Sequence, residues 1–271
     1  MSTTPLPRLL EPEALEPLLG QDDLLVVDLS RADVYARAHV PGAVHLDYGR
    51  LVLGRPPAPG LLPDPEVLRE VLGSVGISPD RRVVTYDDEG GGKACRLLWT
   101  LTLFGLEGSL LNGGLHAWAN EEHPLEQRPN ARVATALETP FEPTALMEAD
   151  YLLAHLGSAD LALLDARSPD EYTGERLYAM RGGHIPGAVN LEWTEAMDRS
   201  RNLRLLPEAE IRALLTERGL TPDREVVCYC QTHHRSAYSW FLLHLLGYPR
   251  ARGYAGSWSE WGNRRDTPVE R

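Results

Sequence analysis

One segment near the end of the chain reads Val226-Val227-Cys228-Tyr229-Cys230-Gln231-Thr232-His233-His234-Arg235-Ser236. β-Branched and aromatic residues dominate as far as Cys230, where a polar run begins. A helical pattern of apolar residues then occupies 237–246. This order of patterns predicts a short strand, a tight loop and a helix.

The chemistry predicted for this loop centres on Cys230. A loop that leads into a helix presents several backbone N–H groups, and the helix adds the positive end of its dipole. Such surroundings lower the pKa of a free cysteine, ordinarily ~8.5, by about one to several units. Arg235 follows in the same segment and adds a permanent positive charge. The segment therefore predicts a nucleophilic sulfur that carries or attacks a negatively charged group.

The bulk composition narrows the classes of protein to consider. The chain has 271 residues, of which 43% are hydrophobic and 24% charged, as in one large or two ordinary globular domains. Its formal net charge of −12 argues against nucleic-acid or membrane binding, which needs a basic face. No apolar run approaches the ~20 residues that span a bilayer, and residues 1–8 do not resemble a signal peptide. Three cysteines are too few for a disulfide framework, so we expect reduced thiols and a cytoplasmic location.

The two halves of the chain carry the same series of motifs. The clearest match is between His39-Val40-Pro41-Gly42-Ala43 and His184-Ile185-Pro186-Gly187-Ala188. Further blocks recur in the same order, with similar separations: 24–28 with 161–165, 61–68 with 205–211, and 83–87 with 226–230. We therefore predict two homologous domains, at 4–125 and 144–271, joined by a proline-containing linker at 126–143.

Each half alternates short buried strands with helical patterns of ~10–15 residues. This alternation predicts an α/β fold in each half, with a mainly parallel sheet that helices cover on both faces. Ligands of such sheets bind beyond the carboxyl ends of the strands. The loop at Cys230 is predicted to lie at such an end.

The repeat aligns Asp87 of the first half with Cys230 of the second. The first loop reads Asp87-Asp88-Glu89-Gly90-Gly91-Gly92-Lys93, with three carboxylates and no thiol. A carboxylate cannot act as a sulfur nucleophile, and this loop would repel an anionic substrate. We therefore predict that the first domain is catalytically silent. A cation site formed by the three carboxylates is the functional alternative to a solvated acidic loop.

The doubled unit, the paired His-x-Pro-Gly-Ala segments and the single catalytic-type cysteine resemble the tandem-domain rhodaneses. These are thiosulfate and mercaptopyruvate sulfurtransferases, and the resemblance covers 8–261. The loop Cys-Gln-Thr-His-His-Arg is similar to that of one group of bacterial thiosulfate sulfurtransferases. It implies that Cys230 is the nucleophile and that 230–235 form its cradle. His233 to Arg235 stand where animal-type loops carry Gly-Val-Thr, and the donor that the resemblance implies is thiosulfate or a related compound.

The resemblance implies sulfur transfer through a persulfide on Cys230. The thiolate takes the outer sulfur of a small anionic donor and passes it to cyanide or a thiol, including that of a dithiol protein. No cofactor and no metal is expected. Arg235 is predicted to be catalytic, because its charge attracts the anionic donor. The remaining loop residues are predicted to bind substrate: Gln231, Thr232, His233, His234 and Ser236.

Several alternatives to this function stay open. The same loop could serve a mercaptopyruvate sulfurtransferase, or a carrier that delivers persulfide sulfur to a protein partner. A cysteine-dependent phosphatase would need five residues between its cysteine and arginine, whereas four separate Cys230 from Arg235. A structural zinc site would need Cys228, Cys230, His233 and His234 to surround one ion, which their spacing disfavours.

Three other residues have structural interpretations. Cys95 and Cys228 are expected to pack in the core, with a resolving thiol as the alternative for Cys228. Arg167 has no counterpart in the first half. It has either a role in the site or an ion pair with Asp165 or Asp170.

Overall fold

The computed structural model describes residues 5–271 and contains two five-stranded parallel sheets. The strands of the first sheet lie in the order β1-β7-β6-β2-β3. The elements of this half are β1 (Leu9–Leu10), α1 (Pro12–Leu15), β2 (Leu24–Asp28), α2 (Ala32–Arg37), β3 (Val44–His45), α3 (Pro65–Ser74), β6 (Arg82–Tyr86), α4 (Gly92–Thr102), β7 (Gly108–Leu111) and α5 (Gly114–Asn120).

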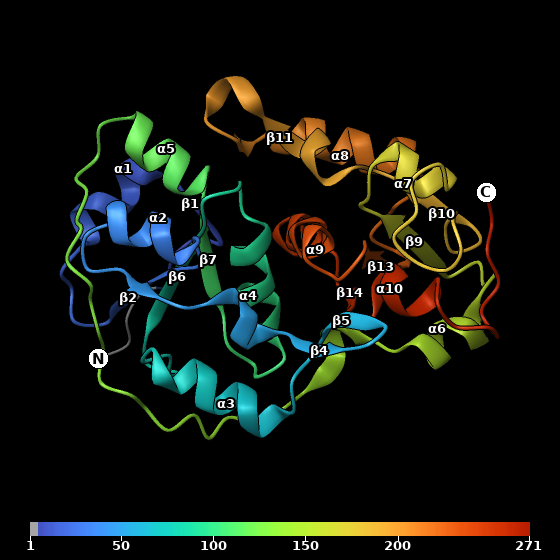
Figure 1. The fold of residues 1–271 in the computed structure, drawn as a ribbon. Coiled ribbons are helices and arrows are strands. Elements are labelled where there is room, and N and C mark those ends of the chain that lie inside the picture. Colours follow the sequence, from blue (N-terminus) through green and yellow to red (C-terminus); the bar gives the residue numbers. More distant parts are fainter. Residues whose placement is uncertain (1–4) are drawn as a thin grey trace. The chain divides into compact units, whose positions relative to one another are not determined.

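The second half repeats this topology. Its strands lie in the order β8-β14-β13-β9-β10, all parallel. The elements are β8 (Leu146–Met147), α6 (Ala149–His155), β9 (Leu161–Asp165), α7 (Pro169–Thr173), β10 (Ala188–Asn190), α8 (Glu208–Glu217), β13 (Glu225–Tyr229), α9 (Arg235–Leu245), β14 (Ala251–Tyr254) and α10 (Ser257–Trp261). The predicted fold class is confirmed, and each sheet lies among helices (Figure 1).

Two antiparallel hairpins stand outside the sheets. They are β4 (Leu53–Arg55) with β5 (Ala58–Leu61), and β11 (Met197–Asp198) with β12 (Arg204–Leu205). Contacts divide the chain into two compact units, in which 52–62 belong to the second unit and 197–205 to the first. Each unit is therefore discontinuous in sequence. Short 3-10 helices complete the structure: Glu16–Leu18, Tyr48–Leu51, Pro143–Ala145, Trp193–Ala196 and Arg199–Arg201.

The core of each unit lies on both faces of its sheet. In the second unit, Val227 and Tyr229 stand at alternate positions of β13 and pack in one cluster with Trp258 and Trp261 of α10. On the other face, α9 packs against β13 and β14. The first unit has the same layers, with Trp118 of α5 in the core cluster of one face and α4 against β6 and β7. Strands buried on both faces explain the continuous apolar runs in the sequence.

The repeated His-x-Pro-Gly segments have the same structural role in both units. The Nδ1 atom of His39 lies 2.7 Å from the Tyr35 carbonyl, and that of His184 lies 2.9 Å from the Tyr172 carbonyl. Each imidazole also stacks on the ring of that tyrosine, at 3.9 and 3.7 Å between centroids. Both histidines are buried. These contacts make them part of the fold.

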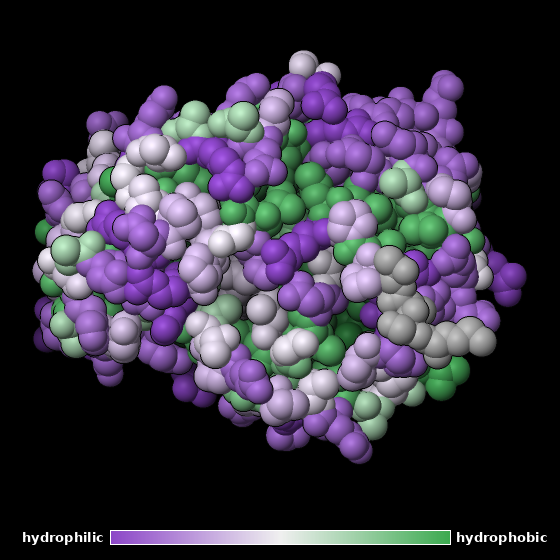
Figure 2. Space-filling model, turned by 180° about the vertical axis from the view of Figure 1, so that it is seen from behind, coloured by the Kyte–Doolittle hydropathy of each residue, from purple (hydrophilic) through white to green (hydrophobic). Residues whose placement is uncertain are grey.

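No helix in residues 5–271 is long and apolar enough to cross a membrane. The longest helices, α4 and α9, have 11 residues each. On the face shown in Figure 2, hydrophilic side chains are spread over the surface and apolar side chains lie between them.

Candidate active site

Cys230 directly follows β13, whose five residues are all buried. This strand pairs with β9 on one side and β14 on the other, and α9 begins at Arg235. The strand, loop and helix predicted from the sequence are therefore present, at the carboxyl edge of the second sheet. Two hydrogen bonds fix the start of the loop. Cys230 N–H donates to Ser257 Oγ (3.3 Å), and Trp258 N–H donates to the Cys230 carbonyl (2.9 Å).

The environment of Cys230 favours a thiolate. The residue is fully buried, and burial alone would raise the pKa of its thiol. The charge of Arg235, the hydroxyl of Ser236 and the backbone N–H groups of Ser236 and Thr232 outweigh burial, so this pKa lies below its ordinary value. Burial, with a smaller contribution from Cys230, raises the pKa of Cys228. The thiol that the sequence singles out is thus the one held ready to ionise.

Arg235 is held by a carboxylate from another element. Its Nη1 and Nη2 atoms donate to Glu171 at 2.6 and 2.8 Å. Glu171 lies in the first turn of α7, where it forms a capping box with Ser168, and its side chain is only 4% exposed. Burial raises the pKa of Glu171, but the hydrogen bonds and charge of Arg235 lower it on balance. The positive charge near Cys230 is therefore shared with a buried carboxylate.

His233 is a buried residue of the loop and contacts Ser236. Its φ of +54° is left-handed, which is uncommon for a residue with a side chain. Its Nδ1 atom lies 2.8 Å from Ser236 Oγ, and both residues are fully buried. Because the Ser236 hydroxyl also lowers the pKa of Cys230, a chain of polar groups connects His233 to the sulfur.

The other predicted site residues have different surroundings. Gln231 Nε2 donates to the Tyr178 carbonyl (3.1 Å), in the segment between α7 and β10. The ring of His234 lies 6.1 Å from that of Trp193. The structure thus brings Thr232, Arg235 and Ser236 to the sulfur, with His233 behind Ser236.

Comparison with known proteins identifies the family of the chain. The family model described as "Rhodanese-like domain" matches residues 11–121 and 148–264. The chain belongs to the rhodanese family. It is 52% identical to a thiosulfate sulfurtransferase of Azotobacter vinelandii, over 98% of this chain and 97% of that protein. It is 48% identical to a thiosulfate sulfurtransferase of Pseudomonas aeruginosa, over the same shares of the two chains.

A solved structure has a similar fold. It is an anaerobic ergothioneine biosynthesis enzyme from Chlorobium limicola, crystallised with trimethyl histidine. The two chains superpose with a TM-score of 0.86 at 26% sequence identity. The match covers 97% of this chain and 70% of that one.

Sequence reasoning did not identify two partners of this rhodanese loop. Glu171 stands 64 positions from Arg235, and only its helix-capping role has a sequence signature, in the spacing Ser168-x-x-Glu171. Ser257, which accepts from the Cys230 N–H, has no signal that separates it from other serines.

Arg167 forms a buried ion pair with Asp165. Its guanidinium binds the Asp165 carboxylate at distances from 2.5 to 3.0 Å, and both side chains are buried. It also lies 4.6 Å from the centre of the Trp258 ring and donates to the Gly183 carbonyl. Of the two interpretations offered by the sequence, the ion pair with Asp165 is the one present.

The loop of the first rhodanese-like domain is closed by its own side chain. The Asp87 carboxylate accepts hydrogen bonds from the backbone N–H groups of Glu89 (3.0 Å), Gly91 (2.8 Å) and Ala94 (3.0 Å). The Asp87 carboxylate thus turns into its own loop, and one of its donors, the Glu89 N–H, is the counterpart of the Thr232 N–H that donates to Cys230. Asp88 and Glu89 bind Lys93 at 3.2 and 3.3 Å. These contacts engage the three carboxylates within the loop and give no support to a cation site.

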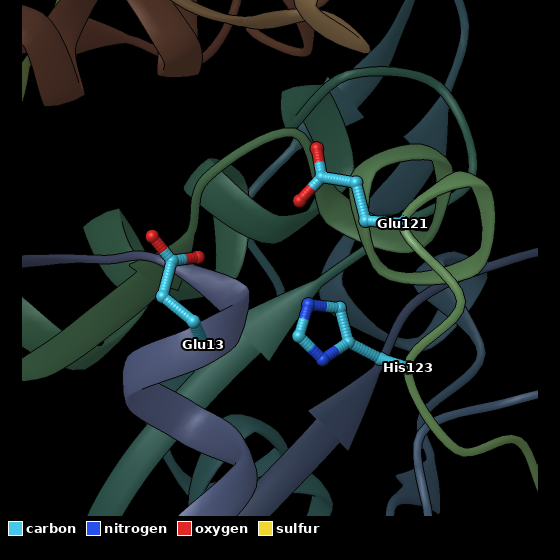
Figure 3. Close-up of side chains that lie close together, drawn as sticks. All are labelled: Glu13, Glu121 and His123. Carbon is cyan, nitrogen blue, oxygen red and sulfur yellow. The ribbon is translucent and has the colours of Figure 1, made fainter.

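Another group of potential metal ligands lies in the first unit. Glu13, Glu121 and His123 have ligand atoms close together (Figure 3), and they form the one such group found in residues 5–271. Arg204 of β12 pairs with Glu121 and lies 3.7 Å from Glu13, while His123 Nδ1 lies 2.6 Å from Glu16. An ion-pair cluster therefore engages these side chains and attaches β12 to this unit.

Proposed function

We propose that this chain is a thiosulfate sulfurtransferase in which Cys230 carries the sulfur as a persulfide. The observation that carries the proposal is the buried thiol whose pKa is lowered by Arg235, Ser236 and loop N–H groups. The names of the 52% and 48% identical relatives support the choice of thiosulfate as donor.

The reaction has two displacement steps. In the first, the Cys230 thiolate attacks the outer sulfur of thiosulfate, a Cys230 S–S bond forms, and the old S–S bond breaks with its electron pair leaving on sulfite. In the second, cyanide or a thiolate attacks the terminal sulfur of the persulfide and restores the Cys230 thiolate. The products are thiocyanate or a persulfide on the acceptor. Both steps balance without a redox cofactor.

The loop stabilises the negative charge that moves between the sulfur atoms. The N–H groups of Thr232 and Ser236 point at the thiolate, and they would bind the persulfide anion in the same way. Arg235 attracts the anionic donor and is positioned by Glu171. Gln231 and His234 are proposed to bind substrate at the edge of the loop, and His233 acts through Ser236.

The two domains differ in activity under this proposal. The first, assigned to 4–125, is catalytically silent because the Asp87 carboxylate fills its loop. The second, assigned to 144–271, holds the reactive thiol, and 126–143 connect them. The three cysteines are buried free thiols, which suits a reducing compartment, and we place the protein in the cytoplasm. The acceptor there would be a thiol, including that of a dithiol protein.

Intact mass spectrometry tests the proposal directly. Incubation with thiosulfate should add about one sulfur atom, ~32 Da, and cyanide or dithiothreitol should remove it. Cys230→Ala should abolish the gain, whereas Cys228→Ala, which removes the neighbouring buried thiol, should retain it. A sulfur gain in Cys230→Ala, or a hydrolysis rate on an aryl phosphate that rivals sulfur transfer, would overturn the assignment.

A further inference from the structure

The hairpin β4–β5 approaches the active loop closely enough to exclude any side chain. It belongs to the second compact unit, where β5 packs against α10. A Cβ atom added to Gly60 would lie 2.2 Å from the Thr232 carbonyl oxygen, 2.6 Å from Thr232 Cβ and 2.8 Å from the Thr232 carbonyl carbon. The φ of Gly60 lies outside the left-handed region. Space, and not backbone conformation, is therefore what requires glycine here.

The backbone that Gly60 touches holds the reactive end of the loop. Thr232 donates its N–H to Cys230, and its carbonyl belongs to the peptide group that leads into His233. His233 has a φ of +54°, a conformation that persists in a non-glycine residue only where its surroundings enforce it. A contact against the Thr232 carbonyl limits rotation of that peptide group. It therefore opposes relaxation of His233 toward an ordinary conformation.

The first unit offers an internal comparison. Gly90 is the counterpart of His233 in the repeat, and it also has a positive φ of +100°. The hairpin β11–β12 reaches Gly90 through flexible side-chain atoms, Met197 Sδ and Cε and Leu203 Cδ1, at 3.2 to 3.4 Å from the ideal Cβ position. In the first unit, the hairpin contacts the loop that has glycine at its left-handed position through side chains. In the second unit, the hairpin contacts the loop that has His233 at this position through the backbone of Gly60.

We propose that Gly60 is a positioning residue for sulfur transfer. By bringing backbone against Thr232, it keeps the Thr232 N–H and the His233 turn aligned on Cys230. Gly60 acts through Thr232 and touches no reacting atom. This role rests on the function proposed above, because it assumes that Cys230 is the sulfur carrier.

The test compares Gly60→Ala with Gly54→Ala in the same hairpin. A Cβ added at Gly54 meets no atom within 4 Å, so this variant controls for a methyl group in the hairpin. Thiolate formation is followed by ultraviolet absorbance against pH, after subtraction of the Cys230→Ser background. Gly60→Ala should ionise at higher pH and form the persulfide about tenfold to a hundredfold more slowly at neutral pH. Gly54→Ala should behave as the unchanged protein.

A wild-type titration curve in folded Gly60→Ala would overturn the proposal. Should Gly60→Ala fail to fold, a variant with residues 53–61 replaced by three glycines takes its place, because Leu53 and Leu61 are paired neighbours and a short turn can join the chain on either side of them. Without the Gly60 contact, the Cys230 thiolate of this variant should also form at higher pH. An unchanged titration would refute the role of the hairpin. The titration does not depend on sulfur transfer, so it separates this inference from the proposed function.

Discussion

Glu171 and Arg235, on the first turns of two different helices, form an ion pair with two hydrogen bonds beside the Cys230 thiol. Without Glu171, the guanidinium would face Cys230 with its full charge but without a fixed orientation. With Glu171, the orientation is fixed and part of the charge is neutralised. Under the proposed function, the pair would set both the ionisation of Cys230 and the attraction of an anionic donor.

Glu171→Gln is expected to make the site more positive. Glutamine retains one oxygen that can accept a hydrogen bond from Arg235, but it lacks the negative charge of Glu171. Thiolate formation at Cys230 should then occur at lower pH, and the Michaelis constant for thiosulfate should fall roughly threefold to tenfold. Ultraviolet titration of the thiolate and steady-state kinetics at low ionic strength measure the two effects.

Asp170→Asn provides the control for Glu171→Gln. Asp170 is the preceding residue of α7 and is exposed, so its replacement removes a charge from the same turn without touching the pair. Equal shifts in both variants would mean that only the general surface charge matters. A rise in the Michaelis constant of Glu171→Gln would show that orientation of Arg235 outweighs its charge.

Ser236→Ala should make the thiolate form of Cys230 less favourable. It removes the hydroxyl that lies between His233 and Cys230 but leaves the Ser236 N–H in place. We expect the thiol to ionise at higher pH and the rate of persulfide formation at neutral pH to fall about tenfold. Ser239→Ala, which changes another buried serine of α9, should leave both quantities unchanged. Equal behaviour of the two alanine variants would remove Ser236 from the site.

The fold could be predicted from the sequence, and Cys230 proposed as the nucleophile, because both depend on local patterns. A buried strand, a polar loop and an apolar helix follow one another in 226–246, and the repeat supplies a second copy for comparison. The strand order that the two units share was not predicted from these patterns. Alignment alone places Asp87 opposite Cys230, and the hydrogen bonds that its carboxylate accepts within the loop support the proposal that this loop is silent.

The partners of the loop were beyond sequence reasoning because they come from distant segments. Glu171 reaches Arg235 only because β9 and β13 are adjacent, so that the elements after them meet at one edge of the sheet. The contact of Gly60 with Thr232 requires knowledge that a hairpin from the first half of the sequence packs in the second unit. Neither partner has a sequence pattern that indicates the contact.

The ion-pair cluster at β12 predicts a pH-dependent contribution to stability. Hydrogen bonds from Arg204 lower the pKa of Glu121 from 4.5 to about 2. A carboxyl group whose pKa is lowered by folding stabilises the folded state above its unfolded pKa, and this contribution is lost as the pH falls from about 4.5 toward 2. Glu121→Gln should therefore reduce the free energy of unfolding at pH ~6 and have a smaller effect at pH ~3.

Urea unfolding of the Glu121→Gln variant and the unchanged protein at several pH values measures this difference. Glu122→Gln is the control, because Glu122 is the adjacent exposed residue and forms no pair with Arg204 among the contacts described for residues 5–271. Its effect should be small and independent of pH, since an exposed charge without a close partner contributes little. A difference for Glu121→Gln that stays constant or grows as the pH falls would contradict the linkage, and the cluster would then hold β12 by packing and not by charge.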